Sequence, residues 1–185
     1  MKAILLTFCT LTLFSLTTMA QFNLFVREKD PKTGKTILHG KVTFQDVQDE
    51  SVNAWFYGGA NAYEPREAAI SVLRRVWGPY RFVVFMGTWC EDTQDLLPKF
   101  YKILNQAGID LHAVEMYGVD RNKKSLHLEE VAYKITHVPT FIVLRQNREV
   151  GRITERPGAS IEEDLAALMQ KDFDELERQR AERFK

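Results

Sequence analysis

Cysteine is nearly absent from this chain, since only Cys9 and Cys90 occur among its 185 residues. Cys9 lies within residues 1–20, where Lys2 is the only charged side chain and a mostly apolar stretch leads to Ala20. This pattern is typical of a secretory signal peptide, which is removed from the mature protein. Its removal would leave Cys90 as the single thiol, which excludes an internal disulfide. Two alternatives remain for that thiol, a buried inert cysteine or one kept for its reactivity.

Excess charge is absent as well, because 25 Lys and Arg residues balance 25 Asp and Glu residues. A chain of zero net charge lacks the broad positive field of nucleic-acid binders, so we do not expect nucleic acid among its partners. The apolar stretch before Ala20 is short and interrupted by polar residues, so we expect no stable membrane span after cleavage. The histidines are scattered along the chain, and we expect neither a metal nor another cofactor.

Apolar residues make up 45% of the chain, which is enough for one packed domain of this length. Their spacing predicts a helix over residues 64–77, and an unbroken apolar run predicts a buried strand at 82–86. Loose alternation predicts a strand at 36–44, and the glycines of residues 58–61 predict a turn. The later segments predict a helix containing Pro98, a strand at 111–116, a short helix at 126–133, a β-hairpin at 141–153, and a long helix capped by Ser160.

Cys90 follows the buried strand and precedes a helix, so its sulfur is expected at the helix N-terminus, where a thiolate is stabilised. We expect the sulfur to accept hydrogen bonds from the N–H groups of Asp92 and Thr93, and the Thr93 hydroxyl to donate to it. The negative charges of Glu91 and Asp92 oppose a neighbouring thiolate. Cys90 and Thr93 are therefore the candidate catalytic residues, and the alternative is a packed, inert cysteine.

From residue 64 the predicted order is helix, strand, helix, strand, helix, strand, strand, helix. That order, with Trp89-Cys90, Pro98 eight residues later and Val138-Pro139-Thr140, resembles the thioredoxin family over residues 64–170. The resemblance implies an α/β fold with a central mixed β-sheet flanked by helices. We expect an N-terminal extension at 21–63 and a thioredoxin-like domain at 64–185 that includes a long C-terminal helix with a charged end.

The same resemblance implies a peptide-binding site beside Cys90. It implies a cis bond before Pro139, with the Thr140 backbone presented to a bound chain, and a Trp89 ring that shields the sulfur. The residues implied to contact substrate are Trp89, Val138, Pro139 and Thr140. Glu91, Asp92, His137 and Asp120 are candidates for tuning the charge of the site, although solvated surface positions are the alternative for His137 and Asp120.

Two positions depart from the family pattern. Thr93 stands where the family has its second cysteine, and Val84 stands where it has a buried aspartate six residues before the first. The family comparison therefore implies a monothiol thiol–disulfide oxidoreductase without a resolving cysteine, whose partners are protein or small-molecule thiols and disulfides. The alternative is a non-catalytic module that binds a peptide or protein.

The segments around Cys90 and at residues 118–125 resemble an exported bacterial subgroup of the family. This subgroup carries a Trp-Cys-x-Asp-Ser/Thr motif with a single cysteine, which Trp89, Cys90, Asp92 and Thr93 match. The resemblance implies an exported protein in the periplasm or cell envelope of a Gram-negative bacterium.

Overall fold

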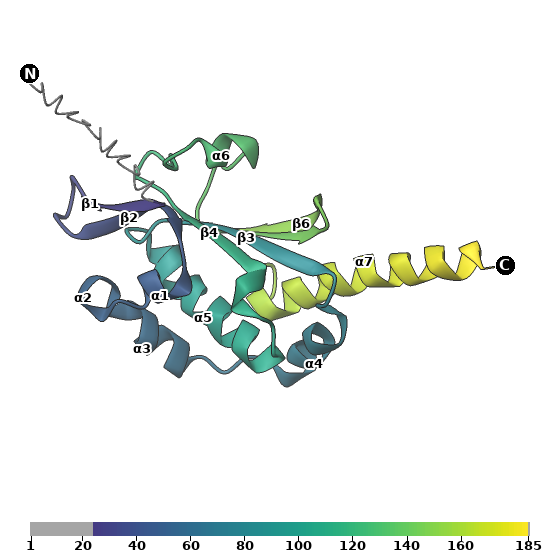
Figure 1. Ribbon diagram of the computed structural model, residues 1–185. Helices are drawn as coiled ribbons and strands as arrows, with labels where there is room; N and C mark the ends of the chain where they lie inside the picture. Colours follow the sequence, from purple (N-terminus) through teal and green to yellow (C-terminus); the bar gives the residue numbers. More distant parts are fainter. Residues whose placement is uncertain (1–23, 185) are drawn as a thin grey trace, which may run out of the picture.

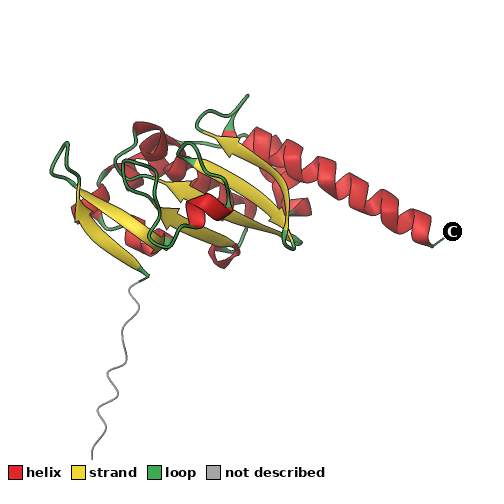
Figure 2. Ribbon diagram, turned by 90° about the horizontal axis from the view of Figure 1, so that it is seen from above, coloured by secondary structure: helices red, strands yellow, loops and turns green. Residues whose placement is uncertain are grey.

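The computed structural model describes residues 24–184, so the expected leader at 1–20 and Cys9 lie outside the described part. A single β-sheet forms the middle of the molecule, and most of the helices pack against one of its faces (Figure 1). The last helix extends well past the sheet (Figure 2). Within residues 24–184, no helix combines the length and the apolar character needed to cross a membrane.

The N-terminal segment before residue 63 is built into the fold. It contributes a β-hairpin and three short helices: β1 (Phe25–Lys29), β2 (Thr36–Val42), α1 (Phe44–Val47), α2 (Glu50–Asn53) and α3 (Trp55–Ala62). The strand predicted at 36–44 is confirmed by β2. The hairpin joins the sheet through β2, which pairs antiparallel with a later strand, β4 (Val114–Gly118).

The turn predicted at residues 58–61 is wrong, because these residues belong to α3. The glycine content that indicated a turn serves helix packing instead. A Cβ atom on Gly59 would lie only 3.0 Å from both Cβ and Cγ of Pro98, so glycine lets α3 approach the helix that carries Pro98. Tertiary packing therefore overrides the local turn preference here.

From residue 64 onward the predicted order of elements is confirmed. The strand predicted at 111–116 begins later, because Leu111–Ala113 forms a 3₁₀ turn in which the Asp110 side chain accepts from the His112 N–H. The elements are α4 (Glu67–Val76), β3 (Tyr80–Met86), α5 (Glu91–Ala107), β4, α6 (Glu129–Ala132), β5 (Thr140–Arg145), β6 (Arg148–Thr154) and α7 (Ile161–Arg183). Ser160 caps α7 by accepting from the Glu163 N–H, as its sequence predicts.

The six strands run in the order β1-β2-β4-β3-β5-β6, so β3 lies in the interior of the sheet. It pairs parallel with β4 and antiparallel with β5. Phe82 and Val84 pack into the large core beneath the helices, and Val83 and Phe85 pack into a smaller cluster on the other face. Burial on both faces explains the unbroken apolar run of this strand. Cys90 follows its C-terminal end.

The last helix is tied to three strands through Asp172. Its nearly buried carboxylate accepts from the Tyr80 hydroxyl at 3.1 Å, from Arg145 Nε at 2.5 Å and from the Arg148 guanidinium. Burial acts against the charged form. The hydrogen bonds from Arg145, Arg148 and Tyr80 outweigh that effect and hold the pKa of Asp172 below its ordinary value.

We predict that Asp172→Asn lowers the free energy of unfolding by about 2 kcal/mol at pH 7, because two guanidinium groups lose their charged partner. A group with a depressed pKa stabilises the fold above its unfolded pKa of about 4, and this contribution is lost as the pH falls through the folded pKa. The difference between wild type and variant should therefore shrink in acid. Urea unfolding at several pH values measures it.

Glu175→Gln is the matched control, since it removes an exposed ion pair with Arg178 on the same helix. We expect it to change stability by less than about 0.5 kcal/mol. Equal stabilities of wild type and Asp172→Asn at neutral pH would contradict the structural role of Asp172.

Candidate functional site

Cys90 occupies the N-cap position of α5, directly after the turn that leaves β3. Its side chain is half-buried and its thiol is free of any disulfide. The Sγ atom lies 3.3 Å from the Val138 carbonyl oxygen, to which the thiol donates a hydrogen bond. The Val138–Pro139 peptide bond is cis. The structure therefore brings the single described cysteine against the proline loop.

The contacts predicted for the sulfur are wrong. The Cys90 side chain makes no capping hydrogen bond to α5, so it does not accept from the N–H groups of Asp92 and Thr93. Thr93 is fully buried, and its hydroxyl accepts the Gly87 N–H at 3.3 Å. The physical reason is that the thiol points to the Val138 carbonyl as a donor, while Thr93 turns inward to hold the turn before Cys90.

Trp89 is held in place by two contacts within the site. Its Nε1–H donates to the Val119 carbonyl oxygen at 3.0 Å. Its indole also lies so close to Gly87 that a Cβ there would be 2.6 Å from Trp89 Cε2. Trp89 and Cys90 both pack against the smaller apolar cluster of the sheet. Glycine at position 87 is therefore what allows the ring to fold back onto the turn.

The residues of the proline loop are largely shielded from solvent. Val138, Pro139 and Thr140 are buried, and the Thr140 hydroxyl donates to the His137 carbonyl oxygen at 2.8 Å. Thr140 is the first residue of β5 and lies between partners on β3 and β6. In this loop, it is the Val138 carbonyl that faces Cys90. The structure places Thr140 inside the sheet.

A groove of about 1150 Å³ opens beside Cys90. One wall is formed by the turn and by the start of α5, and the opposite wall is formed by the β1–β2 hairpin and the α2–α3 region. The residues that matter for its chemistry are Lys29, Asp30, Lys35, Trp55, Trp89, Cys90, Glu91, Asp92, Arg121 and Arg156. The groove thus combines one thiol, two tryptophan rings and charges of both signs.

Arg121 links the two walls. Its Nε and Nη2 atoms donate to the two Asp30 carboxylate oxygens at 2.6 and 2.7 Å. Its guanidinium carbon lies 5.1 Å from the centre of the Trp89 ring, a cation–π arrangement. Hydrogen bonds from Arg121 hold the pKa of the Asp30 carboxyl well below its usual range. The sequence interpretation missed Asp30, because nothing local indicates a contact between residues 91 positions apart.

Two of the residues predicted to tune the site lie elsewhere. His137 is exposed, and its Nδ1 lies 2.9 Å from the Thr136 hydroxyl. The Asp120 carboxylate accepts from the N–H groups of Asn122 and Lys124 and so shapes its own turn. Neither lines the groove, whereas Glu91 and Asp92 do. The structure therefore brings together Trp89, Cys90 and the two acidic residues of α5.

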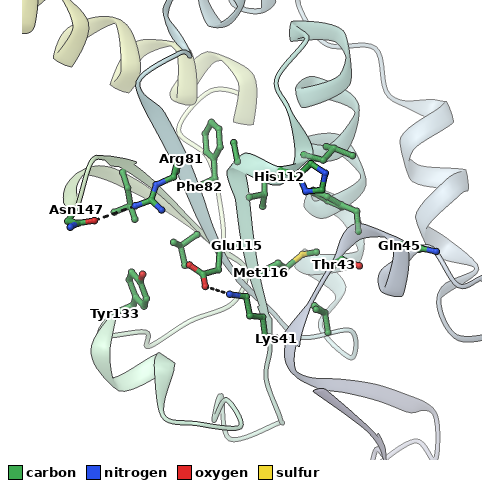
Figure 3. Close-up of a pocket in the computed structure, with 17 residues that line it drawn as sticks. Lys41, Thr43, Gln45, Arg81, Phe82, His112, Glu115, Met116, Tyr133 and Asn147 are labelled. Atoms are coloured by element: carbon green, nitrogen blue, oxygen red, sulfur yellow. Dashed lines mark hydrogen bonds and ion pairs between the residues drawn. The ribbon is translucent and has the colours of Figure 1, made fainter. Parts of the chain in front are cut away.

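A second cavity, of about 850 Å³, lies at the opposite end of the central strands (Figure 3). Lys41 and Glu115 form an ion pair of 2.5 Å there, and Arg81 donates to the Asn147 side chain at 3.4 Å. No cysteine lines this cavity. Across residues 24–184, no group of three or more His, Cys, Asp or Glu side chains is arranged to hold a metal ion. Of these two cavities, the groove beside Cys90 is the one lined by a described thiol.

We predict that Gly87→Ala displaces the Trp89 ring and lowers the free energy of unfolding by about 1–3 kcal/mol, because the added methyl overlaps the indole. Urea unfolding measures the loss. Gly58→Ala is the matched control, since that helical glycine has open space around its Cβ position. It should be neutral or stabilising by up to about 1 kcal/mol. Equal effects of the two variants would show that Trp89 does not depend on Gly87.

Several solved structures are distantly similar to this chain. A protein of unknown function from Pseudomonas aeruginosa is 23% identical, over 67% of this chain and 75% of that chain, with a TM-score of 0.43. An HIV epitope scaffold is 21% identical, over 64% of this chain and 73% of its own, with a TM-score of 0.42. A mutant thioredoxin from Halobacterium salinarum is 14% identical, over 60% of this chain and 87% of that chain, with a TM-score of 0.34.

No curated protein matches the chain. The family model for thioredoxin matches residues 79–171, which is half of the 185 residues. The matched part runs from the start of β3 through Cys90 and the proline loop into α7. This chain belongs to the thioredoxin family.

Proposed function

We propose that this protein is an exported monothiol thiol–disulfide oxidoreductase that acts through Cys90. The observation that carries the proposal is the position of its thiol. Cys90 is half-exposed at the N-terminus of α5, adjoins the proline loop and opens onto a groove large enough for a peptide or a small disulfide. A helix N-terminus favours a negative charge on that sulfur.

The reaction begins when the Cys90 thiol gives up its proton and the thiolate attacks one sulfur of a substrate disulfide. The substrate S–S bond breaks, a bond to Cys90 Sγ forms, and the departing thiolate takes up a proton. A thiolate from a second molecule, either a small thiol or a protein thiol, then attacks the substrate sulfur of the mixed disulfide. Cys90 leaves as a thiolate, so one disulfide has been exchanged for another.

The second thiol must come from outside this site, because neither nearby position supplies the missing chemistry. Thr93 carries a hydroxyl in place of a sulfur, and it is fully buried against the turn. Val84 is packed in the apolar core and has no ionisable group that could transfer a proton. Disulfide isomerisation and removal of glutathione from protein thiols fit this single-thiol cycle, whereas reduction completed by one molecule does not.

The same proposal places the mature protein in the periplasm or cell envelope of a Gram-negative bacterium. It is supported by the leader pattern of residues 1–20 and by the motif of Trp89, Cys90, Asp92 and Thr93, which resembles an exported subgroup. In an oxidising compartment, a single reactive thiol meets substrate disulfides and is not consumed by an internal partner.

We predict that the mature chain forms a mixed disulfide with one glutathione when treated with oxidised glutathione, and that Cys90→Ser forms none. Intact mass spectrometry measures the adduct. Cys90→Ser should also reduce the exchange rate between a glutathionylated peptide and free glutathione to the uncatalysed background. Wild-type exchange in Cys90→Ser would rule out the proposed mechanism.

Thr93→Cys provides a sharper test of the missing resolving thiol. A cysteine there should attack the mixed disulfide and form an internal disulfide, so the glutathione adduct should no longer accumulate. Thr93→Ser is the control, because it keeps the hydroxyl that accepts the Gly87 N–H. It should retain the adduct as in wild type.

A non-catalytic binding module is the second candidate, and two observations favour it. The Cys90 thiol donates to the Val138 carbonyl, which is an arrangement of the protonated form. The carboxylates of Glu91 and Asp92 line the same groove, and a negative charge there repels a thiolate. The pH dependence of Cys90 alkylation separates the two functions. Half-maximal reaction below about pH 8 supports catalysis, and reaction only above about pH 9 supports binding.

A further inference from the structure

The pair formed by Asp30 and Arg121 joins the N-terminal hairpin to the candidate site. Asp30 is almost completely buried, and besides Arg121 it accepts from the Thr33 hydroxyl at 2.6 Å and from the Lys32 N–H at 3.0 Å. These contacts fix the carboxylate within its loop. The two parallel hydrogen bonds in turn fix the plane of the Arg121 guanidinium, because both Asp30 carboxylate oxygens accept from the same edge of that group.

The guanidinium that Asp30 holds belongs to the groove of Cys90. Arg121 lies over the Trp89 ring, and Trp89 is itself anchored through the Val119 carbonyl. The third nitrogen of the guanidinium, Nη1, has no hydrogen bond among residues 24–184, in a side chain that lines the groove. One edge of the Arg121 guanidinium therefore binds Asp30, and the rest of this positive group lies in the groove that Cys90 also lines.

Five other charged side chains line the same groove. Lys29, Lys35 and Arg156 are positive, and Glu91 and Asp92 are negative. Lys29 donates to the Thr36 hydroxyl at 3.3 Å. None of these five side chains forms an ion pair among the described residues, whereas Arg121 is paired with the buried Asp30 carboxylate. Arg121 is the cation whose position is set by a buried partner.

The pKa of Arg121 agrees with this placement. It is raised above its ordinary value, first by the hydrogen bonds to Asp30 and, to a smaller extent, by the charge of the Cys90 thiolate.

We propose that Asp30 is a positioning residue for the Cys90 site, which holds the Arg121 guanidinium against Trp89 so that its positive charge favours the Cys90 thiolate. The inference rests on the proposed thiol chemistry of Cys90. It assigns a role in that chemistry to the N-terminal hairpin, which lies outside the part of the chain matched by the thioredoxin family model.

The test uses the rate of Cys90 alkylation by iodoacetamide as a function of pH. Arg121→Gln should move the midpoint to higher pH and slow alkylation at pH 7 about threefold, because the thiolate loses a nearby cation. Asp30→Asn is the decisive variant, because the two accounts predict opposite signs. If Asp30 acted only through its charge, removing that charge would favour the thiolate and speed alkylation. If Asp30 positions Arg121, alkylation should slow about twofold.

Two comparisons complete the experiment. The double variant D30N/R121Q should alkylate no more slowly than R121Q alone, since Asp30 acts through Arg121. Arg27→Gln is the matched control, because it removes the Arg27–Asp49 ion pair from the same hairpin without touching the groove. It should leave the profile as in wild type.

Arg121→Lys keeps the test decisive even if Asp30→Asn fails to fold. Lysine retains the charge but lacks the two parallel N–H donors that bind the Asp30 carboxylate. If Asp30 positions the cation, this variant should be alkylated more slowly than wild type. Wild-type profiles in R121K or R121Q, or faster alkylation in D30N, would overturn the inference. Because alkylation requires only the thiol, shifted profiles without any disulfide exchange would refute the proposed function and leave the role of Asp30 intact.

Discussion

The burial of β3 on both faces is the constraint on which the candidate site depends. Phe82 and Val84 pack into the core beneath the helices, and Val83 and Phe85 pack into the smaller cluster on the other face. The strand is therefore fixed between β4 and β5. The proline loop leads directly into β5. The sheet therefore fixes the end of β3 relative to that loop. As a result, Cys90 at the start of α5 lies beside the Val138 carbonyl.

The N-terminal segment supplies part of the groove from outside the matched region. The match to the family model begins at residue 79, whereas one wall of the groove comes from residues 29–55. The strands β1 and β2 extend the sheet beyond β4, and this places the hairpin loop across from the Trp89 turn. Lys29, Lys35 and Trp55 therefore line the groove together with the family elements around Cys90.

The success of each prediction depended on how local its causes were. The order of elements from residue 64 was predictable, because apolar spacing and helix caps act within a few residues. The turn predicted at 58–61 was wrong because Gly59 packs against Pro98 on another helix. The sulfur contacts were wrong because the thiol finds the Val138 carbonyl, 48 positions away, as its acceptor.

The sequence by itself determined the α/β class, the position of Cys90 at a helix N-terminus, and the presence of Thr93 where the thioredoxin family has its second cysteine. These properties depend on residue identity and on periodicity along the chain. Only the tertiary structure decided which groups surround the sulfur, because that depends on segments brought together by the sheet. The buried carboxylate of Asp30 meets Arg121 because β2 pairs with β4, a long-range pairing that no local pattern encodes.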